Sequence, residues 1–184
     1  MLASCTSTAP TGRPAPTTEP SAPDGGTNGA PRVATPLDAT HLLDRPCATL
    51  SDDQLTGFGV GRAGEPDPGG SGVAKTVGPS CEWSAEDGSR NGITITWYTE
   101  GKTGLANHYD HRDEAAYFME TTVDRYPAVF MDWQDLRDAG SCAIVVGVSD
   151  TLTFGVTTTG ELDTDACDRT KQVAAAVIQN LLDR

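Results

Sequence analysis

The chain has 184 residues, enough for one domain with a tail, and its 26 Asp and Glu against 13 Lys and Arg give a net charge of −13. This charge argues against a nucleic-acid backbone as partner and against direct docking on anionic lipid head groups, because both need clustered Lys and Arg. An acidic surface ordinarily keeps an exported domain soluble, because like charges repel one another and prevent aggregation. The alternative is that the negative charge binds a cation or a basic protein.

The N-terminal segment differs in composition from the rest of the chain. Seven of the twelve prolines fall in the first 36 positions, among Thr, Ser, Gly and Ala. Such a segment cannot bury enough apolar surface to offset the entropy lost on ordering. We therefore expect residues 1–36 to form a disordered linker and residues 37–184 to form a single domain.

Leu2-Ala-Ser-Cys5 has small residues directly before a cysteine, the pattern at which a lipoprotein signal peptidase cleaves. We predict that Cys5 carries the lipid that holds the protein at the outer face of the cytoplasmic membrane. A signal peptide has a charged and then an apolar region before its cleavage site, so we expect the signal peptide to be truncated at Met1. The alternative is a chance cysteine in a disordered tail.

The first predicted elements of the domain are short. Residues 38–45 form a helical turn, and a second helix starts at Ser51, which can cap it while Gln54 reaches back. The Gly- and Pro-rich residues 61–80 form a loop. Residues 81–85 and 92–99 form an antiparallel hairpin, with alternating apolar side chains in the second arm.

The second half of the domain begins with residues 105–119, which are polar but compatible with a helix, and a strand at 126–133. Residues 142–148 and 152–157 form the clearest hairpin. The last helix starts at Asp163. It carries a stripe at i, i+3 and i+4 spacing, which consists of Cys167, Thr170, Ala174, Val177 and Leu181.

This order of elements predicts an α+β fold, with an antiparallel sheet of about five strands and helices packed mainly on one face. Besides Cys5 there are four cysteines, and an even number in an exported chain predicts two disulfides in any of three connectivities. Zinc is the competing interpretation, but the sequence has no C-x-x-C pair.

Four cysteine-containing motifs occur in a characteristic order: Leu43-Asp-Arg-Pro-Cys47, Cys81-Glu-Trp83, Cys142 before a Val-rich strand, and Asp165-Ala-Cys167. In this order the chain resembles, over residues 37–182, the actinobacterial lipoprotein family called domain of unknown function 3558. The resemblance implies a secreted, lipid-anchored envelope protein and no known reaction. The order also implies the pairings Cys47–Cys81 and Cys142–Cys167, which would join the first helical segment to the first hairpin and the last helix to the strand beneath it.

A search for catalytic and metal-binding groups finds no complete set. His108 and His111 share a helix face at i, i+3, but a third ligand with suitable spacing is absent, so we expect a solvated face and no metal. The acidic residues at the start of the last helix lack the spacing of a calcium loop. G-x-S-x-G and phosphate-loop motifs are absent as well. We therefore predict that the protein is not an enzyme and needs no cofactor.

The three tryptophans fall in predicted strands, where burial is the usual outcome. Trp133 has the most polar neighbours, in the segment Met131-Asp-Trp-Gln-Asp135. It is therefore our candidate for an exposed surface contact.

These features favour a lipid-anchored binding or interaction module of the cell envelope, a monomer that contacts an envelope protein or a small ligand. A purely structural envelope component fits the same features. The alternative is an envelope hydrolase whose acid–base pair comes from non-adjacent Asp, Glu or His residues. A closed pocket with facing carboxylates or a His–carboxylate pair would favour the hydrolase, and an exposed apolar patch on the sheet would favour the binding module.

Overall fold

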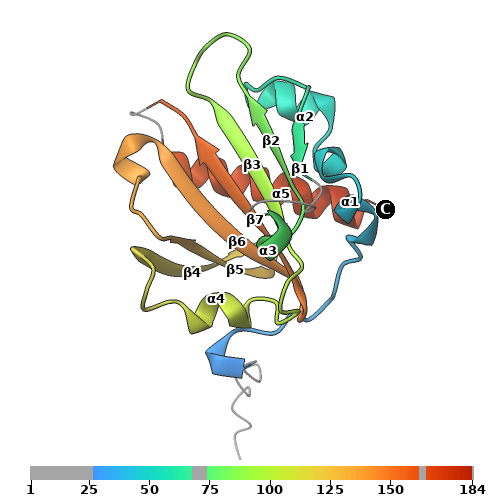
Figure 1. The fold of residues 1–184 in the computed structure, drawn as a ribbon, viewed down its shortest axis with the longest axis vertical. Coiled ribbons are helices and arrows are strands. Elements are labelled where there is room, and N and C mark those ends of the chain that lie inside the picture. Colours follow the sequence, from blue (N-terminus) through green and yellow to red (C-terminus); the bar gives the residue numbers. More distant parts are fainter. Residues whose placement is uncertain (1–26, 68–73, 162–164, 184) are drawn as a thin grey trace, which may run out of the picture.

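The computed structural model describes residues 27–67, 74–161 and 165–183, and this part of the chain contains a seven-stranded antiparallel sheet crossed by one long helix (Figure 1). The strands are β1 (Glu65–Asp67), β2 (Ser80–Ser84), β3 (Gly92–Tyr98), β4 (Tyr117–Val123), β5 (Tyr126–Asp132), β6 (Ser141–Ser149) and β7 (Leu152–Thr159). The helices are α1 (Thr40–Leu43), α2 (Asp52–Gly57), α3 (Ala74–Val77), α4 (Ala106–Asp110) and α5 (Ala166–Leu182). Short 3-10 turns occur at η1 (Thr27–Gly29), η2 (Pro46–Thr49) and η3 (Arg137–Ala139).

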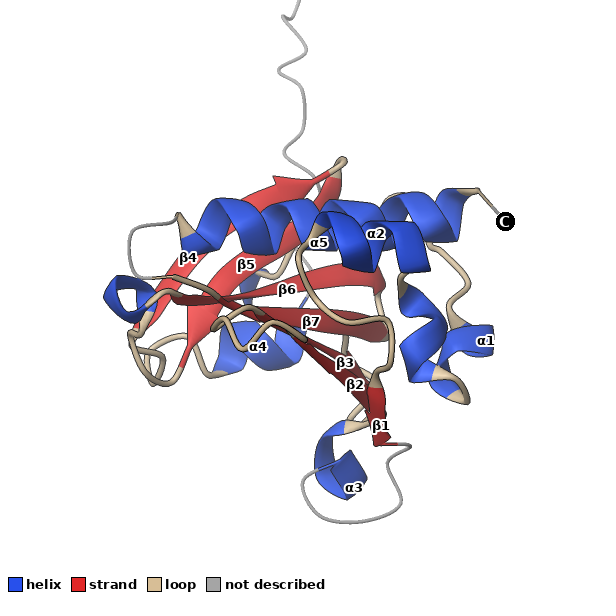
Figure 2. Cartoon of the chain, turned by 90° about the horizontal axis from the view of Figure 1, so that it is seen from above, coloured by secondary structure: helices blue, strands red, loops and turns tan. Residues whose placement is uncertain are grey.

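The sheet order is β1-β2-β3-β7-β6-β5-β4, so two strands that are distant in sequence pair in the middle. There Ile95 of β3 lies opposite Val156 of β7, which on its other side lies opposite Ile144 of β6. The predicted α+β class with an antiparallel sheet is therefore confirmed. In the described residues, α5 and α2 cover one face, and the short α3 and α4 lie on the other (Figure 2).

The described sheet has two strands more than the expected five. β1 lies within residues 61–80, where the sequence predicts a loop, and its three residues pair with β2 at the sheet edge. β4 begins within residues 105–119, where the sequence predicts a helix, because α4 already ends at Asp110. The Phe, Thr and Val side chains of β4 suit a strand better than a helix.

The turn between β4 and β5 explains why this hairpin is hard to predict. Asp124 and Arg125 form a two-residue connection in which both residues have positive φ, 44° and 67°. Such turns normally carry Asn-Gly or Asp-Gly, because these residues adopt the left-handed region at little cost. Asp-Arg lacks that signal.

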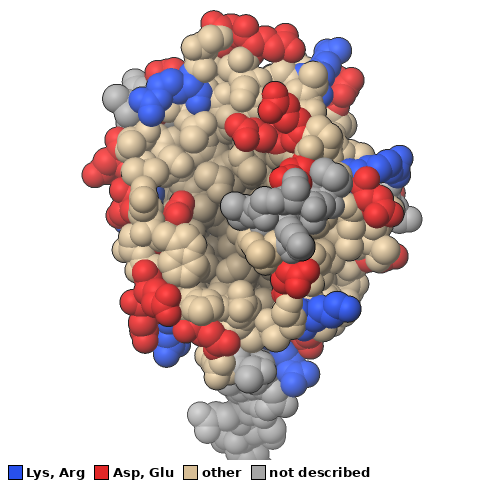
Figure 3. All heavy atoms as spheres, in the orientation of Figure 1, with Lys and Arg blue, Asp and Glu red and all other residues tan. Residues whose placement is uncertain are grey.

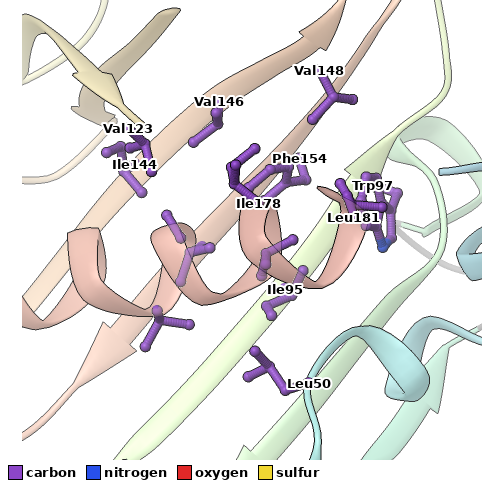
Figure 4. Packing of buried hydrophobic residues seen from close by; sticks show 14 of the residues in the cluster. Leu50, Ile95, Trp97, Val123, Ile144, Val146, Val148, Phe154, Ile178 and Leu181 are labelled. Carbon is purple, nitrogen blue, oxygen red and sulfur yellow. The ribbon is translucent and has the colours of Figure 1, made fainter. Parts of the chain in front are cut away.

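The core lies between the sheet and α5 (Figure 4). Alternate residues of the central strands point to α5, and the predicted stripe of α5 faces them. The fully buried residues of this core include Ile95, Trp97, Ile144, Val146, Phe154, Val173, Val177 and Ile178. Each large side chain of this kind contributes about 1.5–3 kcal/mol on burial. The helix begins at Ala166, because Asp165 is extended and its carboxylate accepts a hydrogen bond from the Asp168 amide. The expected start, Asp163, lies outside the described residues.

The predicted cap of α2 is confirmed. The Gln54 amide donates to the Ser51 hydroxyl, and the Ser51 amide donates to the Gln54 side chain at 2.8 Å. The same Gln54 side chain donates to Asn180 of α5 at 3.0 Å. The cap therefore also attaches α2 to the long helix.

Both disulfides that the motif order implies are confirmed. Cys47–Cys81 joins η2 to β2, and Cys142–Cys167 joins β6 to the first turn of α5. The paired cysteines are 34 and 25 residues apart. In the chain-entropy model each bridge of this span stabilises the fold by about 3–4 kcal/mol.

Packing against the sheet begins before residue 37. Ala30 and Val33 are buried, the Val33 amide donates to the Asp150 carboxylate at 3.0 Å, and the Leu37 amide donates to the Val148 carbonyl at 2.8 Å. The described chain thus enters the domain beside α4 and the β6–β7 turn (Figure 1). Cys5 lies outside the described residues, so its lipid stays a prediction. Within the described ranges, no helix is both long and apolar enough to span a membrane.

Candidate functional site

The sheet face that points away from α5 is partly uncovered and lined with small or polar residues. On β7 this face presents Thr153, Gly155 and Thr157, which alternate with core residues such as Phe154. A concave cavity of about 540 Å³ lies over this part of the sheet. Figure 3 shows it as a hollow in the middle of the molecule. Cavities of this size accommodate small ligands.

The floor of the cavity comes from the paired strands β6 and β7, with Ala143 and Val145 on one and Gly155 and Thr157 on the other. The opposite side of these strands packs on α5, and Cys142 at the start of β6 is bonded to that helix. The floor therefore lies on a rigid part of the domain.

Tyr98, at the end of β3, lies against the floor at Gly155. A Cβ atom at Gly155 would come 2.8 Å from Cε2 and 3.0 Å from the hydroxyl oxygen of Tyr98. The Tyr98 ring can therefore occupy this position only because residue 155 is a glycine, which has no side chain. Burial raises the pKa of Tyr98, and the negative charge of Asp132 raises it further. The phenol therefore stays neutral and can act as a hydrogen-bond donor to a ligand.

His108 forms the inner wall beside Tyr98. His108 is buried, with 8% of its surface exposed. Its Nε2 lies 3.4 Å from the Thr153 hydroxyl, and its ring meets Tyr98 edge-on. Burial lowers the pKa of His108 to about 4, with the charge of His111 as a smaller cause. The imidazole is thus neutral at pH 7.

The prediction of a solvated helix face for both histidines is therefore wrong for His108. α4 rests on the sheet, and Leu105 at its start occupies the space that a side chain at Gly147 would need. This contact turns His108 toward β7, whereas His111, just after the helix, is exposed.

The rim of the cavity carries Trp133, His111 and Glu114. Trp133, which its polar neighbours made the candidate for exposure, is 58% exposed, whereas Trp83 and Trp97 are 1% and 0% exposed. The rings of Trp133 and His111 have centroids 6.2 Å apart, and His111 Nδ1 lies 3.4 Å from the Glu114 carboxylate. That Trp133 contacts a partner stays a prediction.

The charge on the lining is of one sign. Glu100, Glu114 and Asp132 contribute carboxylates, and none of the described lining residues is Lys or Arg. Acidic side chains surround the hollow in Figure 3, and the basic side chains of this face lie toward its edges. The cavity is therefore unsuited to an anion.

Catalytic and metal-binding groups are sparse at this site. Within the described ranges, no group of three or more His, Cys, Asp or Glu residues is close enough to hold a metal ion. His111 and Glu114 form the His–carboxylate pair that a hydrolase could use, but their side chains are 46% and 70% exposed. Such exposure favours solvation of both groups over acid–base chemistry.

Tyr98, His108 and Asp132 are cavity residues that the sequence analysis did not assign to a site. One signal could have indicated their surroundings. In β3 and β7, Thr, Tyr and Gly alternate with large apolar residues and therefore lie on the opposite face of the sheet. Such alternation is typical of a sheet that is packed on one face only.

Comparison with known proteins gives one family. Residues 1–180 match the model of a family described as a protein of unknown function (DUF3558). No curated protein and no solved structure matches the chain.

Proposed function

Since the chain belongs to the DUF3558 family, whose function is unknown, we propose a role from its geometry: a monomeric, lipid-anchored ligand-binding module of the cell envelope. Cys5 would carry the lipid, and the ligand would occupy the cavity on the uncovered face of the sheet. The net charge of −13 supports a module that binds no nucleic acid.

The observation that carries this proposal is the cavity itself. It is concave, about 540 Å³ in volume, and combines small and apolar floor residues, such as Ala143 and Val145, with polar groups from several elements. Small-molecule sites typically have this composition. Its inner wall is built from Tyr98 and His108, which hold each other in place over β7. A ligand would therefore meet a largely preformed surface.

The test is a ligand screen by two-dimensional ¹H–¹⁵N NMR, with a panel of neutral, anionic and cationic fragments added to the ¹⁵N-labelled domain. We expect the shifts caused by a bound fragment to cluster at Tyr98, His108 and the Trp133 indole. A substitution that fills the cavity, Thr157→Phe, should abolish these shifts. A panel in which no fragment perturbs these residues would contradict the proposal.

The matched control is Thr122→Phe. Thr122 is an exposed strand residue on β4 and is outside the cavity lining, so the same change of side chain leaves the cavity open. Fragments should bind Thr122→Phe as they bind the unaltered protein. Equal loss of binding in both variants would point to a general effect of the added ring.

The anchor has a test of its own. Expressed behind a lipoprotein signal peptide in an actinobacterial host, the protein should fractionate with the membrane, and Cys5→Ser should release it. Release of both forms would contradict the lipid anchor without affecting the proposed cavity.

An envelope hydrolase is the second candidate, supported by the His111–Glu114 pair at the rim. In such an enzyme Glu114 would orient the imidazole, and His111 would activate a water molecule. Hydrolysis of chromogenic ester or amide substrates that disappears in His111→Ala would support this candidate, and no turnover in either protein would remove it.

A further inference from the structure

The chemistry of the cavity rim restricts its ligand. Carboxylates of Glu100, Glu114 and Asp132 border the cavity, and Trp133 is exposed beside them. On the basis of the ligand-binding function proposed above, we propose that the ligand is a small organic cation, either an amine or a quaternary ammonium ion.

The carboxylates have few partners that would cancel their charge at the cavity. The Asp132 carboxylate accepts a hydrogen bond from the Trp133 amide at 2.7 Å, and this neutral donor does not cancel its negative charge. This charge is felt inside the cavity, because it contributes to the raised pKa of Tyr98. Among the ion pairs of the described residues, Glu114 takes part in the one with His111 Nδ1, at 3.4 Å. An anionic ligand would be repelled by these groups, and a cation would be attracted.

The inner wall does not offset this negative charge. His108 is the buried basic residue of the lining, and burial holds its pKa at about 4. At pH 7 it therefore contributes a neutral imidazole. The described part of the lining holds no Lys or Arg that could take its place.

The aromatic groups fit the same ligand class. Trp133, at 58% exposed, presents a large ring at the rim, and large exposed aromatic side chains commonly mark a contact. The face of a Trp or Tyr ring attracts a cation through its quadrupole, and Trp does so most strongly. Trp133 follows directly after Asp132, so one segment supplies both an aromatic face and a carboxylate.

The charge of the whole domain also favours a cationic ligand. With a net charge of −13, the domain raises the local concentration of cations and lowers that of anions. Neutral ligands such as sugars gain nothing from this field. The field therefore favours a cation over a sugar, although both stack on aromatic rings.

The experiment compares ligands of equal shape and different charge. Choline is paired with 3,3-dimethyl-1-butanol, its uncharged carbon analogue, and benzylammonium is paired with benzyl alcohol. Each is titrated into the ¹⁵N-labelled protein at pH 7 and low salt, with the Tyr98, His108 and Trp133 signals as the readout. We expect each cation to bind at least about tenfold more tightly than its neutral partner, which corresponds to about 1.4 kcal/mol.

Two variants test the groups responsible. Glu114→Gln combined with Asp132→Asn should weaken cation binding at least about fivefold, because it removes two of the carboxylates that attract the cation. Asp53→Asn combined with Asp183→Asn is the matched control, since it removes the same net charge from exposed positions on α2 and at the end of α5. Trp133→Leu should weaken cations about 3- to 30-fold, the usual range of a cation–π contact.

The outcomes separate this inference from the function on which it rests. Equal affinity for a cation and its neutral partner, or preferential binding of glucose or acetate at the cavity signals, would overturn the cation assignment and leave a ligand cavity. Equal loss in the rim and control double variants would also overturn it. Absence of any shift at the cavity with every probe would overturn the binding function itself.

Discussion

The ring of Tyr98 meets the imidazole of His108 edge-on, with 4.8 Å between the ring centroids and 82° between the ring planes. The contact joins the end of β3 to α4, and both rings rest on β7, at Gly155 and Thr153. Two residues from separate elements thus form one wall of the cavity. The burial of His108 in this wall has a consequence for stability.

Stability should depend on pH through His108. Burial holds its pKa at about 4 in the folded protein, whereas an unfolded histidine has a pKa of about 6.5. Between these values the unfolded chain binds more protons, so the free energy of unfolding falls as the pH falls from 6.5 to 4. The full effect is roughly 3 kcal/mol. Urea unfolding at several pH values measures it.

The variant His108→Gln should remove this part of the pH dependence. His111→Gln is the control and should keep most of it, because the charge of His111 is the smaller cause of the shift. If His108→Gln and the unaltered protein lost the same stability between pH 6.5 and 4, the imidazole would not be buried as described.

Trp133 should account for the quencher-accessible fluorescence, because Trp83 and Trp97 are buried. Acrylamide should quench one fraction of the emission, and this fraction should be absent in Trp133→Phe. Since carboxylates surround Trp133, caesium should quench it more strongly than iodide does, relative to free N-acetyltryptophanamide. A larger effect of iodide would contradict the acidic rim.

Thr158 and Thr170 form a buried polar link between β7 and α5. Their hydroxyl oxygens lie 2.6 Å apart, and the Thr170 hydroxyl also lies within hydrogen-bond distance of the carbonyls of Ala166 and Cys142. Thr170→Val should lower the free energy of unfolding by about 1–3 kcal/mol, because it leaves buried polar groups without a partner.

Two further variants test this link in denaturant unfolding. Thr158→Val combined with Thr170→Val should cost less than the sum of the single changes, because the two hydroxyls share one interaction. Thr56→Val is the control at an exposed helix position and should change stability by less than about 0.5 kcal/mol. Additive losses would show that the hydroxyls act independently.

At position 125 in the β4–β5 turn, glycine should be more stable than the arginine that the protein carries. Arg125 has a φ of 67°, a region that costs most side chains about 1–2 kcal/mol. Arg125→Gly should raise the melting temperature, since relief of this cost exceeds the added entropy of glycine, for a net gain of about 0.5–1 kcal/mol. Thr151→Gly, in the β6–β7 turn where φ is not positive, should lower it. A decrease in both variants would contradict the left-handed conformation of Arg125.

Local patterns predicted much of the fold. The β6–β7 hairpin follows from two apolar runs with a short turn between them, and α5 follows from a stripe that repeats every three or four residues. Both signals lie within one segment, so burial of one face is sufficient to select the element. The β4–β5 hairpin lacks such a signal, because its turn uses Asp124 and Arg125 where glycine or asparagine is usual.

The amino-acid sequence by itself determined the α+β class, the β2–β3 and β6–β7 hairpins, the cap of α2, and, through its family resemblance, the disulfide pairing. It also indicated Trp133 as the exposed tryptophan, because the neighbours of that residue are polar. Only the tertiary structure decided that His108 is buried against Tyr98 and that a cavity lies over Gly155. The reason is physical: a hairpin or a helix depends on neighbours in the chain, whereas the burial of a side chain and the shape of a cavity depend on which distant strands pair beneath it.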